Sequence, residues 1–118
     1  MTEIIFNSGD YATLLSEAEK LGFTQTDEEG NVTIVTNGTF ASGGGWFLNI
    51  VGTIYDDQDP PVVRAGYWGR LRLNGTPDNM PTFSPAITQY VYSEALGGWT
   101  SDGTTLAPDW VATIGVIA

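Results

Sequence analysis

The sequence predicts an α+β fold, in which one N-terminal helix packs on a twisted, mainly antiparallel sheet, or half-open barrel, of about six strands. Apolar residues recur at helical spacing in one segment only, close to the N-terminus. The rest of the chain alternates β-branched and aromatic segments with turns that contain most of its fifteen glycines and six prolines. With 118 residues the chain is expected to form a single domain, 1–118. A β-sandwich with the helix as an appendage is the alternative.

The N-terminal segment is expected to form a short strand followed by the helix. Glu3–Phe6 predicts the strand, and the helix is expected over about residues 9–21. Ser8 or Asn7 is the expected N-cap, and Gly22 suits a left-handed C-cap. The apolar side chains of the helix form one stripe that is expected to lie on the sheet: Tyr11, Leu14, Leu15, Ala18 and Leu21. The polar side chains are expected to face away from the sheet: Ser16, Glu17, Glu19 and Lys20.

Two strands are expected next, over residues 32–36 and 46–55, with a hairpin turn at Asn37-Gly38 and a glycine-rich loop before the second strand. Apolar residues on both faces of the second strand predict a central strand that is covered on each side, with the helix as one cover. One face is expected to consist of Trp46, Leu48, Ile50 and Ile54. The other is expected to consist of Phe47, Val51 and Tyr55.

The second half of the chain predicts further strands separated by long loops. Asp56–Pro61 interrupts the sheet, and residues 62–73 then alternate between two faces. One face resembles a core and carries Ala65, Tyr67, Gly69, Leu71 and Leu73. The opposite face carries three arginines and an indole: Arg64, Trp68, Arg70 and Arg72. Further strands are expected over residues 87–92 and 110–117, and residues 96–99 between them are expected to form a turn with a short strand.

Composition argues against several classes of function. The chain has fourteen acidic residues, four cationic residues, no histidine and no cysteine. Zinc sites and general-base catalysis near neutral pH depend mainly on His and Cys, so no enzyme activity, metal or cofactor is expected. Four cations cannot neutralise many phosphates, so nucleic acid is not an expected partner. No segment approaches the roughly 18 apolar residues of a membrane span, and no basic signal-peptide region is present.

The acidic residues are concentrated in the first half of the chain. Residues 1–59 hold ten acidic residues and one basic residue, a net charge of −9. This pattern favours a solvated face, and a basic partner is the alternative. Asp56-Asp57-Gln58-Asp59 offers several carboxylates to a calcium ion, but the segment lacks the Gly and Glu spacing of an EF-hand loop. A solvated turn is therefore the favoured interpretation.

The candidate interface is the face that carries Arg64, Trp68, Arg70 and Arg72. Arginine beside an aromatic ring can hold a carboxylate or a planar group. The same arginines can instead pair with acidic residues of the chain or meet another protein. We expect Trp68 to be exposed at an interface, and a buried Trp68 is the alternative. Exposed rings at Trp46, Trp68 and Trp99 would suit sugar stacking, although such rings are mostly core in small β domains.

Three segments resemble small accessory proteins encoded among the structural genes of tailed bacteriophages and prophages: Gly44–Asn49, Gly66–Arg70 and Ile114–Ala118. The resemblance implies a non-enzymatic structural or assembly protein that contacts a protein partner or copies of itself, in the virion or the host cytoplasm. It assigns no site residues. A carbohydrate-contacting host-recognition module and an acidic inhibitor that imitates nucleic acid are the alternatives. The apolar segment Val111–Ala118 is expected to be buried in the sheet or in an interface.

Overall fold

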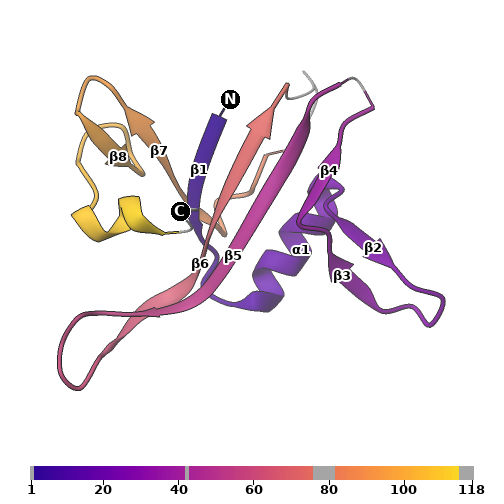
Figure 1. Ribbon diagram of the computed structural model, residues 1–118, viewed down its shortest axis with the longest axis horizontal. Helices are drawn as coiled ribbons and strands as arrows, with labels where there is room; N and C mark the ends of the chain where they lie inside the picture. The colour runs from indigo at the N-terminus through magenta and orange to yellow at the C-terminus, as the bar shows by residue number, and fades with distance from the viewer. Residues whose placement is uncertain (1, 42, 76–81, 115–118) are drawn as a thin grey trace.

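The computed structural model describes residues 2–41, 43–75 and 82–114. Six strands form one antiparallel sheet in the order β4-β5-β6-β1-β7-β8, while β2 and β3 form a separate two-stranded sheet (Figure 1). This is the predicted α+β fold, with a sheet that stays open. The elements are β1 Thr2–Asn7, α1 Tyr11–Leu21, β2 Thr24–Thr26, β3 Val32–Ile34, β4 Asn37–Thr39, β5 Gly45–Tyr55, β6 Val63–Asn74, β7 Thr88–Ser93, β8 Gly98–Thr100 and the 3₁₀ helix η1 Asp109–Thr113.

A side chain caps the N-terminus of helix α1, and a glycine caps its C-terminus. The N-cap is Asp10, whose carboxylate accepts a hydrogen bond from the Thr13 N–H at 2.7 Å. The predicted caps are wrong because both side chains bind β6 instead: the Ser8 hydroxyl donates to the Tyr67 carbonyl, and the Asn7 side-chain oxygen accepts from the Tyr67 N–H. The predicted C-cap, Gly22, is confirmed, since it adopts a left-handed conformation with φ of 80°.

The first core lies between α1 and one face of the sheet. Of the predicted helical stripe, Leu14 and Ala18 are fully buried, whereas Leu15 and Leu21 are half-buried. Tyr11 is 44% exposed. These helix residues meet side chains from β1, β5, β6 and the segment before β7: Phe6, Leu48, Leu71, Leu73, Phe83 and Ile87. The helix-on-sheet arrangement predicted from the spacing is therefore confirmed.

Glu17 lies on the buried side of α1, which corrects the prediction that it faces away from the sheet. Its side chain is only 4% exposed. One carboxylate oxygen accepts from the Ser84 N–H at 2.6 Å, and the other accepts from Lys20 Nζ at 2.8 Å. These hydrogen bonds lower the pKa of Glu17, and the bond from Lys20 has the largest effect. Glu17 thus fixes the segment before β7 to the helix, a contact that helical periodicity does not reveal.

The second core lies on the opposite face of the sheet, beneath the C-terminal part of the described chain. Ile5 and Trp68 from the sheet pack there against Val111 and Ile114. The predicted strand over residues 110–117 is wrong, because Asp109–Thr113 forms a 3₁₀ helix whose Val111 side chain points into this core. Residues 115–118, half of the predicted apolar segment Val111–Ala118, lie outside the described residues.

Strand β5 changes face in its middle, which corrects its predicted pattern. The register against β6 shifts on both sides of Gly52, whose φ is 84°. As a result Leu48 and Ile50 pack in the first core, while Ile54 packs in the second. No described segment supplies the predicted second cover over three residues of this strand, which are exposed by 39% or more: Phe47, Val51 and Tyr55.

The chain between α1 and β5 differs from the prediction in its turns. Asn37-Gly38 was expected as a hairpin turn, but it belongs to β4 and pairs with β5. A side chain at Gly38 would overlap the Trp46 indole, whose Nε1–H donates to the Val35 carbonyl at 3.1 Å. The glycine therefore allows the indole to lie flat against β4, stacked on Phe23 with ring centroids 4.6 Å apart. Strand β2 was not predicted from the sequence.

Candidate functional site

The four residues of the predicted interface do share one face of β6, but the C-terminal segment covers much of that face. Trp68 is only 3% exposed, so the expectation that it is an exposed contact residue is wrong. Its ring lies 5.3 Å from that of Trp110 and 6.0 Å from that of Tyr90. Its Nε1–H has no hydrogen-bond partner within the described ranges. Trp68 is therefore a core residue.

Arg70 holds the C-terminal segment on the sheet. Its side chain is 7% exposed, and its Nε donates to the Ile114 carbonyl at 2.9 Å. A terminal nitrogen donates to the Ala112 carbonyl at 2.8 Å, and the other lies 3.4 Å from the Glu3 carboxylate. Its guanidinium also lies over the Trp99 ring, 5.1 Å from the centroid. Burial lowers the pKa of Arg70, but an arginine stays charged at any ordinary pH.

The other two arginines also bind groups of the same chain. Arg72 Nε lies 2.7 Å from a Glu3 carboxylate oxygen. The Arg64 guanidinium lies over the Trp110 ring, 4.1 Å from its centroid. Of the interpretations that the sequence left open, intramolecular pairing is the one the geometry shows. Through these contacts, the arginines on this face of β6 attach both β1 and η1 to β6.

Several exposed apolar side chains lie at the end of the β5–β6 hairpin, which extends away from the body of the protein (Figure 1). We call this group the hairpin surface, and it consists of Val51, Tyr55, Val62 and Val63, with exposed fractions of 41%, 60%, 52% and 53%. Tyr55 and Val63 are direct cross-strand partners. The sequence placed Val51 and Tyr55 on the second face of β5, which was expected to be covered. In the structure, both side chains are exposed, and no described residue buries them.

A hollow of about 390 Å³ adjoins the hairpin surface on the side of η1. Its lining includes Val51 and Tyr55 of the hairpin surface and the contacting pair Arg64 and Trp110. The remaining lining residues are Ile54, Asp57, Thr113 and Ile114. The hollow extends the hairpin surface into a concave region, in which a guanidinium and an indole are already fixed by their mutual contact.

The acidic loop at the tip of the hairpin is a structured turn. A carboxylate oxygen of Asp56 accepts from the Gln58 N–H at 3.0 Å and the Val62 N–H at 2.9 Å. These hydrogen bonds lower the pKa of Asp56, and the bond from Val62 has the largest effect. Across the described ranges, no group of three acidic side chains is arranged to hold a metal ion. The loop is thus held by hydrogen bonds to Asp56, and the residues from Asp57 to Pro61 are exposed.

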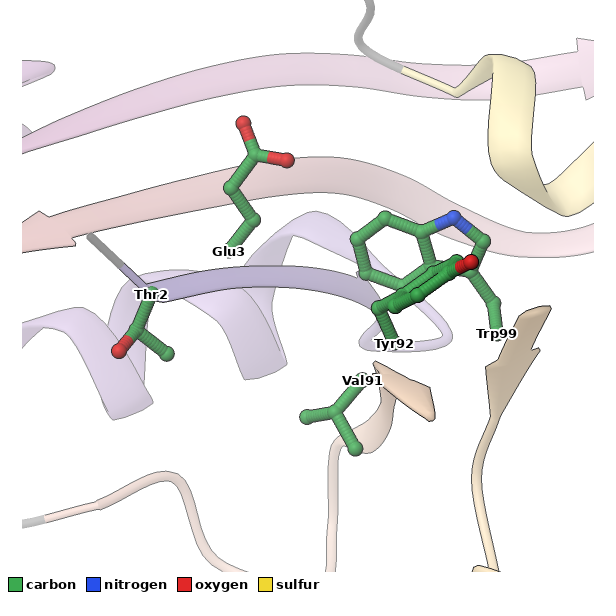
Figure 2. A pocket seen from close by; sticks show the side chains of 5 residues that line it. All are labelled: Thr2, Glu3, Val91, Tyr92 and Trp99. Carbon is green, nitrogen blue, oxygen red and sulfur yellow. The ribbon is translucent and has the colours of Figure 1, made fainter. Parts of the chain in front are cut away.

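A second cavity, of about 520 Å³, opens where β1 and β7 separate (Figure 2). Pairing between these strands ends at Ile5 and Tyr90, and from Val91 onward β7 pairs with β8 instead. We call this space the β1–β7 cavity, and it is lined by Thr2, Glu3, Val91, Tyr92 and Trp99. Of the rings considered for sugar stacking, Trp99 lines this cavity and also packs against the second core, whereas Trp68 is buried in the second core and Trp46 packs against the first.

No known protein family, no curated protein and no solved structure matches this chain. Among the helices formed by the described residues, none is long and apolar enough to cross a membrane. The function must therefore be inferred from the geometry of the chain itself.

Proposed function

We propose that this chain is a non-enzymatic structural or assembly protein of phage type, and that it binds a protein partner through the hairpin surface. The observation that supports this is the concentration of exposed apolar side chains at the end of a projecting hairpin. Gathered apolar side chains on a surface are typical of protein interaction sites. Tyrosine is also among the residues that dominate binding energy at such sites. The phage setting is supported by the sequence resemblance alone.

The charges around the hairpin surface indicate the chemistry of the partner. Residues 51–63 contain three aspartates and no cation. Two of the aspartates, Asp57 and Asp59, are exposed beside the apolar side chains. The nearest cation along the chain, Arg64, lies on Trp110. A complementary partner therefore presents an apolar patch with cationic side chains around it. Charge pairs of this kind at a rim favour rapid association and weaken with added salt.

The proposal can be tested with a double variant, Tyr55→Ser with Val63→Ser. Wild type and variant are immobilised and exposed to an extract of the native source, and a retained protein is identified, purified and bound again in a calorimeter. We expect the double variant to bind the purified partner at least about tenfold more weakly, because a central tyrosine is lost. Added salt should weaken the wild-type complex.

Tyr92→Ala is the matched control, because Tyr92 is as exposed as Tyr55 but lies on β7, across β1 from the hairpin. This variant should bind the partner like the wild type, and circular dichroism should show that all variants are folded. Equal affinity of the double variant and the wild type would contradict the proposal. So would a partner that proves to be nucleic acid.

A further inference from the structure

The β1–β7 cavity combines an exposed aromatic ring with a fixed carboxylate. Figure 2 shows that Glu3 extends from β1 to the same side as the rings of Tyr92 and Trp99, while Thr2 and Val91 extend to the other side. Its volume of about 520 Å³ lies within the range of roughly 300–1,000 Å³ that is usual for small-molecule sites. Its lining, mainly apolar with a few polar groups, is also typical of such sites.

The aromatic part of the cavity consists of two rings in contact. Tyr92 is 57% exposed and meets the Trp99 ring edge-on, with centroids 5.9 Å apart. Trp99 in turn lies beneath the Arg70 guanidinium. The Tyr92 ring therefore presents a solvent-accessible surface whose orientation is supported from behind. A ligand with an apolar face can stack on it without first ordering the side chain.

The Glu3 carboxylate retains capacity to accept hydrogen bonds. A carboxylate offers about four lone-pair sites. One Glu3 oxygen binds Arg72 at 2.7 Å, and the other faces Arg70 at 3.4 Å. These contacts fix the position of the carboxylate and leave about two acceptor sites for a ligand that carries donors. A purely apolar ligand would remove those sites from water without compensation.

Charge selects a neutral ligand. Glu3 is the charged residue that lines the cavity, whereas Arg70 and Arg72, which pair with it, do not line it, so an anion in the cavity would meet the carboxylate first. A cation would compete with Arg70 and Arg72 for the same carboxylate. We propose that the β1–β7 cavity binds a neutral pyranose sugar, with its apolar face on the Tyr92 ring and its hydroxyls donating to Glu3. This site is separate from the hairpin surface.

The inference can be tested by titrating isotope-labelled protein with glucose, galactose, mannose and N-acetylglucosamine, and by screening a glycan array. Amide signals of the five residues that line the cavity should shift with at least one neutral pyranose. Tyr92→Ala should raise Kd about tenfold, because ring stacking is lost. Tyr92→Phe keeps the ring and should stay within about threefold of wild type. Tyr55→Ala, at a similarly exposed tyrosine of the hairpin surface, should bind the sugar normally.

Two results would overturn the inference. One is that no neutral pyranose, free or on the array, shifts the amide signals of the cavity. The other is that a folded Tyr92→Ala protein binds sugar as well as the wild type. If that variant does not fold, the map of shifts on the wild type decides the question. Because Tyr92 and Tyr55 serve as mutual controls, failure of sugar binding is distinguishable from failure of the protein contact.

Discussion

Replacing Arg70 by alanine should destabilise the protein far more than replacing Arg72, although both arginines pair with Glu3. The Arg70 side chain is 7% exposed and donates to the carbonyls of Ala112 and Ile114. The Arg72 side chain is 31% exposed and binds Glu3 at 2.7 Å. The two substitutions therefore remove the same charge from the same face of β6. Arg70→Ala removes it from a buried hydrogen-bond network, whereas Arg72→Ala removes it from a partly solvated ion pair.

The expected magnitudes follow from this difference. Arg70→Ala leaves the Ala112 and Ile114 carbonyls without their donor. A buried group left unsatisfied costs about 1–3 kcal/mol, and breaking a buried charge network costs about 3–5 kcal/mol. We expect about 3–5 kcal/mol for Arg70→Ala. An exposed ion pair contributes about 0.2–1 kcal/mol, so Arg72→Ala should fall in that range.

Urea unfolding followed by circular dichroism measures both free energies, and the dependence on urea shows whether the transition remains cooperative. Amide hydrogen exchange gives a second measurement. In Arg70→Ala, exchange at Val111 and Ile114 should be faster, because η1 has lost its attachment to the sheet. Equal destabilisation by the two variants, or unchanged exchange in η1, would refute the role assigned to Arg70.

Two further predictions concern the second core and the loop after β8. Trp68→Ala should lower the free energy of unfolding by about 3–5 kcal/mol, since the ring is 3% exposed, and an unchanged melting temperature would contradict its burial. Hydrogen bonds from the N–H groups of Thr104 and Thr105 lower the pKa of Asp102 to about 2. The folded pKa lies below the ordinary value of 3.8, so this stabilisation is present above pH 3.8 and is lost as the pH falls toward 2. Melts of wild type and Asp102→Asn should therefore differ at neutral pH and converge near pH 2.

The elements that could be predicted are those in which one periodicity continues without interruption. Leu14 and Ala18 follow helical spacing, and the alternation of Leu71 and Leu73 against Arg70 continues through β6. Such patterns record which side of an element is buried, so α1 and β6 were found with nearly correct bounds. The bounds of β5 were also nearly correct, but its predicted faces were wrong beyond Gly52, where the register shifts.

The features that could not be predicted depend on residues that are distant in the sequence. Glu17 was assigned to solvent because its partner, the Ser84 N–H, comes from another part of the chain. Trp68 was assigned to an interface because nothing local shows that η1 covers it. Whether a side chain is exposed also depends on distant segments. Tyr55 is exposed because no described segment lies over the hairpin, and Tyr92 is exposed because β1 and β7 separate.

The position of β1 in the sheet has a consequence for folding during synthesis. This strand joins β4-β5-β6 to β7-β8, with Thr2 opposite Leu73 and Asn7 opposite Thr88. The ribosome therefore synthesises β1 long before β6 and β7. The apolar segment Ile4–Phe6 of β1 stays unpaired until those two strands are made. Contacts between such distant residues slow folding and expose strand edges to aggregation. Strand β1 thus depends on two strands that are synthesised much later, and yields of folded protein should be sensitive to the rate of translation.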